Sequence, residues 1–256
     1  MPKSLFSRTL GALCCVATAL WLSGCATAPV TYRTRTDAAE LASKLTAVNG
    51  APLDISVEQI SAGGSTEKHD ELTTLVGTNV TSAFAKNHGY TLSAPGPEWE
   101  APELRQELEE VQALLRAIYI TTGGIYRAQP APAAFDHRVG RIDRIADALR
   151  SDAVLFVLVR DQYSTGGRKA VMVLGMLAGA AAGVAIAPPM GLTASCAALV
   201  SRDGTILWLN NLGAAGLDLR NPANADSWVK RLMDGHPKLP APAAPAPRGL
   251  EAVRAE

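Results

Sequence analysis

The segment Ala153–Val159 has the sequence Ala-Val-Leu-Phe-Val-Leu-Val and carries no polar residue on either of its alternating faces. A strand of this kind has to be covered on both faces, which is typical of the centre of a sheet between two layers of helices. The helical pattern of Arg138–Leu149 leads directly into it. We therefore predict a layered α/β domain with this strand at its centre.

Other segments favour the same fold class. Leu53–Ile60 alternates apolar and polar residues like a half-buried strand, and Thr193–Val200 and Thr205–Asn210 flank an Asp-Gly hairpin turn. Further helices are predicted by Leu72, Val76, Val80 and Phe84 before Gly89, by Leu104, Leu108, Val111, Leu115 and Ile118 after Pro102, and by Ala225–Met233. We expect a single α/β domain over residues 49–235, with a mixed sheet and flanking helices.

The N-terminus has the pattern of a bacterial lipoprotein signal peptide. Lys3 and Arg8 precede an apolar run that ends in Leu22-Ser23-Gly24-Cys25, a lipobox. We predict a signal peptide over residues 1–24 and acylation of Cys25. The apolar run from Thr9 to Leu22 is too short for an uncleaved transmembrane anchor, which needs about 20 residues. Cleavage after Ala28, as in an ordinary secreted protein, is the remaining alternative.

The segments on either side of the domain differ from it in composition. Residues 25–48 are predicted to form a lipidated tether and a short helix over Asp37–Val48, and residues 236–256, rich in proline and alanine, a disordered tail. Ala26 follows the lipobox cysteine. In Gram-negative lipoproteins aspartate at that position favours the inner membrane, so Ala26 indicates the outer membrane.

Charge and cysteine content exclude several functions. The chain has 24 basic and 24 acidic residues, and loss of Lys3 and Arg8 with the leader leaves a net charge of −2, which gives no sign of nucleic-acid binding. Cys14 and Cys15 also leave with the leader. With Cys25 acylated, Cys196 has no partner for a disulfide, and its apolar neighbours predict a small buried residue.

The apolar segment 170–187 contains no charged or polar side chain. In a helix, Gly175, Gly179 and Gly183 would share one face, which allows close approach of another helix. Three interpretations follow: a buried crossover helix packed on the sheet, an interface with a second subunit, or insertion into the membrane beside the lipid anchor.

Catalytic and cofactor motifs are not found in the sequence. There is no GxSxG, HExxH, Walker or Rossmann pattern. We therefore expect no enzymatic activity, cofactor or metal, and we interpret Glu103, Glu107 and Glu110 as a solvated helix face and the four histidines (His69, His88, His137 and His236) as exposed or capping residues. An enzyme that uses Asp136, His137 or Asp161 is a minor alternative.

Two segments resemble a broad set of envelope lipoproteins: Asp152–Val157, where a helix leads into an apolar strand, and Ala198–Trp208, a hairpin that ends in tryptophan. The set includes curli-secretion-channel-like lipoproteins, lipoprotein activators of penicillin-binding proteins and uncharacterised proteobacterial lipoproteins. The similarity covers residues 50–212.

Together with the lipobox, this resemblance implies a non-enzymatic outer-membrane lipoprotein that faces the periplasm. We expect it to serve as an assembly or accessory component of an envelope complex. The alternative is a subunit of an export or pore-forming oligomer. The expected partners are the membrane, through the lipid anchor, and another copy of the chain or an envelope protein.

Overall fold

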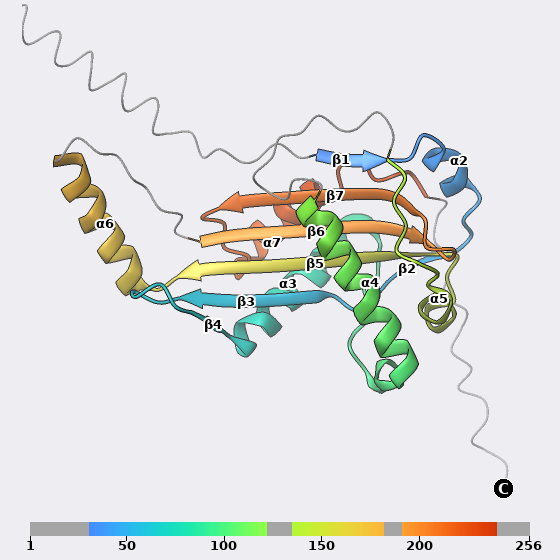
Figure 1. Ribbon diagram of the computed structural model, residues 1–256, viewed down its shortest axis with the longest axis horizontal. Helices are drawn as coiled ribbons and strands as arrows, with labels where there is room; N and C mark the ends of the chain where they lie inside the picture. The colour runs from blue at the N-terminus through green and yellow to red at the C-terminus, as the bar shows by residue number, and fades with distance from the viewer. Residues whose placement is uncertain (1–30, 122–134, 182–190, 240–256) are drawn as a thin grey trace, which may run out of the picture.

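The computed structural model describes residues 31–121, 135–181 and 191–239 (Figure 1). These residues form a mixed sheet with the strand order β1-β7-β6-β5-β3-β4, and β2 also pairs with β5. The strands are β1 (Thr31–Thr34), β2 (Val48–Gly50), β3 (Asp54–Ile60), β4 (Thr66–Lys68), β5 (Ala153–Ser164), β6 (Gly191–Ser201) and β7 (Ile206–Ala215). The helices are α2 (Ala38–Ser43), α3 (Asp70–His88), the 3-10 turn η1 (Pro97–Glu100), α4 (Pro102–Thr121), α5 (Asp143–Leu149), α6 (Gly166–Ala181) and α7 (Pro222–Leu232).

The sheet combines parallel and antiparallel pairs around β5. Strands β2 and β3 lie parallel to β5, whereas β6, β7 and β1 follow one another in antiparallel pairing. The predicted α/β class, with one layered domain and a mixed sheet, is confirmed.

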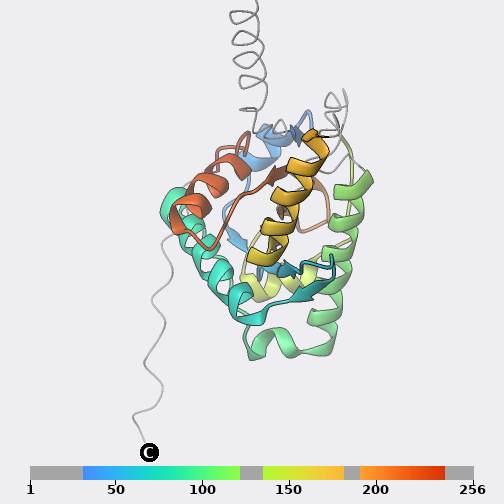
Figure 2. The same ribbon diagram turned by 90° about the vertical axis from the view of Figure 1, so that its left-hand side faces the viewer.

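Helices cover both faces of the sheet. Figure 2 shows α3 and α7 on one side and α4 on the other, with the sheet between them. The first side forms a core around Phe84, Trp208 and Trp228, and α4 and α5 enclose a second core with Leu115 and Phe156. Because alternate residues of β5 enter different cores, its sequence needs no polar face, and the predicted central strand is confirmed.

A tight turn joins β6 and β7 at Gly204. Gly204 has a φ of 83°, and a Cβ atom at this residue would overlap the carbonyl oxygen of Gly140. Asp203 accepts hydrogen bonds from Ser201 Oγ and from the backbone amide and hydroxyl of Thr205. Glycine is therefore required here by both backbone conformation and space, as the Asp-Gly pattern predicted.

The helix predicted over Arg138–Leu149 begins five residues later than expected, at Asp143. Val139 and Ile142 instead donate backbone hydrogen bonds to the carbonyls of Gly204 and Arg202 in the hairpin. Tertiary pairing thus replaces the local helical preference. Glu107 also differs from its predicted solvated position, because it accepts hydrogen bonds from the amide of Ile145 and the guanidinium of Arg144.

The folded domain extends beyond both predicted boundaries. Thr31–Thr34, assigned to the tether, pairs with Trp208–Asn211 as an edge strand. The helix expected over Asp37–Val48 ends at Ser43, since Val48 belongs to β2. At the other end, His236 packs edge-on against Trp208 and Tyr90, although the predicted disordered tail begins at this residue. The rest of the predicted tail, from 240 onward, lies outside the described residues.

Candidate interaction surface

Helix α6 projects from the end of β5, away from the two helical layers (Figures 1 and 2). The helix begins with Gly166 and Gly167, which are followed by the cations Arg168 and Lys169. Its remaining residues, 170–181, are all apolar or glycine. Among the described elements, α6 has no extensive contact with any other helix or strand. The helix thus presents an apolar surface of its own.

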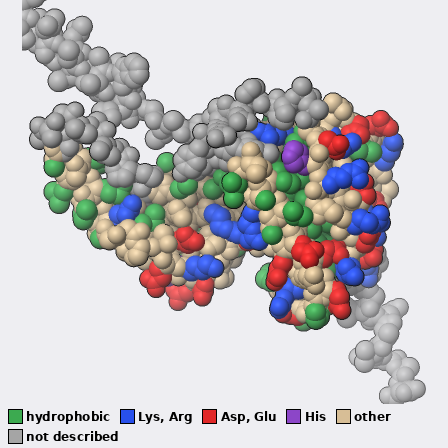
Figure 3. All heavy atoms as spheres, in the orientation of Figure 1, with side chains coloured by type: hydrophobic (Ala, Val, Ile, Leu, Met, Phe, Trp, Pro, Cys, Tyr) green, Lys and Arg blue, Asp and Glu red, His purple; other side chains and the backbone are tan. Residues whose placement is uncertain are grey.

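The large aliphatic side chains of α6 are exposed. The exposed fractions are 67% for Leu174 and 64% for Leu177, with 55% for Val171 and 46% for Val173. Met172 is buried, and Met176 is partly buried. Figure 3 shows hydrophobic side chains along this helix. Four such residues clustered on one element are an apolar patch, unlike the isolated exposed leucines that are common on soluble proteins.

The two sides of α6 differ in character. With about 100° of rotation per residue, Met172 and Met176 share one side, and Leu174 and Leu177 lie on nearly the opposite side. Gly175 lies about 60° from Met172, nearer the methionine side, and a Cβ atom there would meet no atom within 4 Å. Leu174 and Leu177 therefore lie apart from Gly175, whereas the exposed Val171 lies only about 40° from it.

These observations correct one interpretation of the apolar segment. A crossover helix buried against the sheet would have its large side chains covered, whereas Leu174 and Leu177 are mostly exposed. The sequence pattern drew attention to the glycines and missed the aliphatic face; the signal for it was the absence of any polar position across residues 170–181. Gly179 lies within α6, and Gly183 is outside the described residues, so the helix-packing face of Gly175, Gly179 and Gly183 stays a prediction.

The described chain begins at Thr31, which is level with the middle of β5. Thr31 pairs with Asn211, and β1 runs antiparallel to β7, which itself runs toward the α6 end. Thr31 is therefore the end of β1 that lies nearer α6. Cys25, the predicted acylation site, lies outside the described residues, six positions before Thr31 in the sequence.

A buried carboxylate lies near the start of α6, on the face covered by α3 and α7. Asp161 is 2% exposed and accepts a hydrogen bond of 2.6 Å from Thr193 Oγ1. The pKa of Asp161 is raised to about 6, chiefly by burial and also by the negative charge of Asp218, while the Thr193 hydrogen bond and the charge of Arg220 act to lower it.

The surroundings of Asp161 are structural in character. Arg220 forms an ion pair of 2.7 Å with Asp218 and lies over the Tyr163 ring, 4.5 Å from its centre. These contacts hold the loop between β7 and α7 against β5. Among the residues that the structure describes, the side-chain hydrogen bond of Asp161 is made with the hydroxyl of Thr193.

The other residues considered for catalysis lie elsewhere. Asp136 forms an ion pair with Arg35, whose backbone amide donates to the carbonyl of Leu207. Asp161, by contrast, pairs in register with Thr193, which faces Ala214 on β7. Leu207 and Ala214 are seven residues apart, or about 23 Å along the strand. The structure therefore does not bring Asp136 and Asp161 together.

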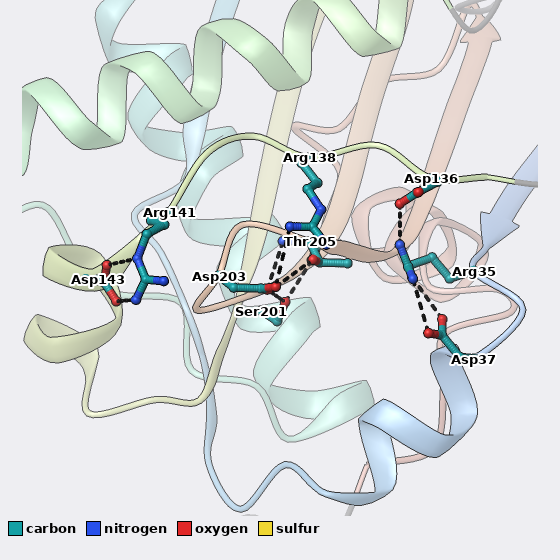
Figure 4. A network of polar contacts seen from close by, with 9 residues as sticks. All are labelled: Arg35, Asp37, Asp136, Arg138, Arg141, Asp143, Ser201, Asp203 and Thr205. Atoms are coloured by element: carbon teal, nitrogen blue, oxygen red, sulfur yellow. Dashed lines mark hydrogen bonds and ion pairs between the residues drawn. The ribbon is translucent and has the colours of Figure 1, made fainter.

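Charged side chains at the hairpin end form pairs that hold loops in place. Figure 4 shows Arg35 between Asp37 and Asp136, and Arg141 paired with Asp143. The ion pair between Arg141 and Asp143 is 2.7 Å long. The Arg141 guanidinium lowers the pKa of Asp143. Each carboxylate in this network faces a cation or a hydroxyl of the chain itself, which indicates a structural role.

A cavity of about 200 Å³ lies between α4 and the sheet. Its apolar walls include Leu158, Ala194 and Cys196, and Arg116 and Arg160 stand at its edge, both paired with Asp54. The volume is below the roughly 300–1,000 Å³ of ordinary ligand pockets. Nothing in its lining identifies a ligand.

Cys196 is buried, as predicted, and burial raises the pKa of its thiol to about 12. Burial lowers the pKa of His236 to about 4, so this histidine differs from the exposed or capping role predicted for it. Within the described ranges, no cluster of histidine, cysteine and carboxylate side chains has the arrangement of a metal site. In the same ranges, no helix combines the length and apolarity needed to cross a membrane.

The chain matches no protein-family model and no curated protein by sequence. Among solved structures it is similar to the PelC dodecamer from Paraburkholderia phytofirmans, with 9% sequence identity and a TM-score of 0.32. That alignment covers 80% of this chain and 95% of PelC. A PelC variant from the same organism gives the same identity and TM-score, with 96% of its chain covered. A likeness this low carries no inference about assembly or function.

Proposed function

We propose that this protein is a non-enzymatic, periplasm-facing outer-membrane lipoprotein that works as an assembly component of the envelope, held by acyl chains on Cys25. The observation that supports a contact surface within the envelope is α6, a helix whose large aliphatic residues are exposed on an otherwise well-packed domain. The polar clusters around Asp161, Asp136 and Asp143 support the same proposal, because their hydrogen bonds and ion pairs serve to hold loops.

The anchor is tested by metabolic labelling of the full precursor with an alkyne analogue of palmitate. The wild-type protein should incorporate the label and fractionate with outer membranes, and Cys25→Ser should lose both properties. Cys196→Ser is the matched control, because this thiol is buried and should leave labelling unchanged. Labelling that persists in Cys25→Ser would contradict the anchor.

Assembly is tested separately by crosslinking in cells. The lipidated protein should be recovered from mild detergent with at least one specific envelope protein or with a second copy of itself. A strict monomer that crosslinks to no protein would contradict the assembly role and leave the lipid anchor intact. Ring-shaped oligomers with membrane conductance would instead favour the alternative, an export or pore-forming subunit.

A further inference from the structure

We infer that the exposed aliphatic side of α6, which carries Leu174 and Leu177, contacts the surface of a lipid bilayer. This is the same bilayer that holds the acyl chains of Cys25. In this arrangement α6 lies in the interface as a second membrane contact and sets the orientation of the domain. The inference rests on the proposed acylation of Cys25. Its geometric basis is that the reach of the chain from Cys25 to Thr31 is comparable with the separation between Thr31 and the start of α6.

The length of chain before β1 limits how far the domain can lie from the membrane. Six residues join Cys25 to Thr31, and a fully extended chain of this length spans at most about 21 Å. Thr31 is the end of β1 nearer α6, so a region of this radius around Thr31 covers much of the distance to the start of α6. An acylated Cys25 would therefore keep this end of the domain near the bilayer.

The start of α6 lies within a comparable distance of Thr31. In the sheet register, Thr31 is level with Asn211, Cys196 and Leu158, and Ser164 is six residues farther along β5. That displacement is about 20 Å along the strands and about 14 Å across three strand spacings, which combine to about 25 Å. The helix itself is about 24 Å long. The acyl chains and α6 can thus meet one membrane plane.

The side-chain chemistry of α6 matches a lipid surface. Leu174 and Leu177 project on the side away from the buried Met172, and residues 170–181 have no charge that would have to be desolvated. Lys169, at the start of the helix, is exposed and can extend its ammonium group to lipid headgroups while its stem stays apolar.

A second copy of the chain fits this surface less well. Pairing through the glycine face would bring Gly175 to the interface, because close helix packing depends on small residues. Leu174 lies about 100° from Gly175, and Leu177 about 160° from it, so both would remain largely in water. A bilayer covers large aliphatic side chains without requiring a complementary shape.

The test uses the full-length mature lipoprotein in vesicles of phosphatidylethanolamine and phosphatidylglycerol. Leu177→Cys and Leu174→Cys supply single reactive thiols for an environment-sensitive fluorophore, since Cys196 is buried and Cys25 is acylated. Leu114→Cys is the matched control: it replaces a leucine that is 44% exposed on α4. Vesicle flotation and labelling by the palmitate analogue report the anchor independently of the probes.

We expect the probes on α6 to shift to the blue and to be quenched several-fold more strongly by nitroxide-labelled lipid than the probe at position 114. If the protein floats with the vesicles but the probes on α6 remain accessible to aqueous iodide, the inference is wrong and the lipid anchor is unaffected. If the probes are shielded from iodide but not quenched by nitroxide-labelled lipid, and dimers can be crosslinked through position 177, then a second copy covers α6. This result would also overturn the inference. Failure of the protein to float or to take up the palmitate label would overturn the anchor and the inference together.

Discussion

The replacement of Asp161 by asparagine should make the protein more stable at neutral pH and leave its stability almost unchanged at acidic pH. Asp161 is buried, and its native pKa of about 6 exceeds the ordinary value of 3.8. Between these two pH values the native state binds more protons than the unfolded state, so the free energy of unfolding falls as pH rises. The charged Asp161 therefore destabilises the fold above pH 6.

The size of this effect follows from the two pKa values. At about 1.4 kcal/mol for each pH unit between them, ionisation of Asp161 costs about 3 kcal/mol at pH 8. Asparagine keeps an oxygen that can accept the hydrogen bond from Thr193 but carries no charge. The variant should thus gain up to about 3 kcal/mol over the wild type at pH 8 and almost nothing at pH 4.

Urea unfolding followed by tryptophan fluorescence at a series of pH values measures this difference. Two buried tryptophans, Trp208 and Trp228, report loss of the core on the same side of the sheet. Thr193→Val is the companion variant: loss of its hydroxyl removes a group that lowers the pKa of Asp161, so the fall in the stability of this variant with rising pH should continue to higher pH than in the wild type. A difference between Asp161→Asn and wild type that stays constant from pH 4 to pH 8 would refute the reasoning.

Three other substitutions test the packing around the sheet. Leu115→Ala, in a fully buried position of α4, should lower the free energy of unfolding by about 2–5 kcal/mol in urea titrations, and a loss below 1 kcal/mol would contradict the tight packing of this core. Gly204→Ala should shift the thermal midpoint down sharply, because its methyl group overlaps the Gly140 carbonyl; an unchanged midpoint would refute that contact. Glu107→Gln should keep one acceptor for the Ile145 amide and lose less stability than Glu107→Ala, for which we expect about 1–3 kcal/mol by chemical denaturation. Equal losses in the two variants would show that this hydrogen bond contributes little.

Elements with strong periodicity were predictable because one local pattern decides each of them. The stripe Val76, Val80 and Phe84 predicted α3, and Gly89 ends that helix with a φ of 69°. The Asp-Gly turn likewise predicted the hairpin of β6 and β7. In these segments the burial of side chains and the backbone preference favour the same structure.

Elements that depend on a distant partner could not be predicted. Thr31–Thr34 has no apolar alternation, and it becomes a strand only because the edge of β7 offers it hydrogen bonds. The segment before Asp143 is helical in pattern but pairs with the hairpin instead. Glu107 looks solvated in its own helix, and only the position of α5 gives it two hydrogen-bond donors.

The local sequence and the tertiary structure likewise each determine part of the candidate surface on α6. The composition of residues 170–181 alone requires that this helix find an apolar environment, since it contains no residue that prefers water. Whether the sheet supplies that environment depends on where the end of β5 directs the chain, a property of the whole fold. The local sequence thus determined the central strand, the hairpin and the apolar helix. The tertiary structure decided that α6 leaves the domain with Leu174 and Leu177 exposed, because burial is settled by the neighbours that the fold brings to a side chain.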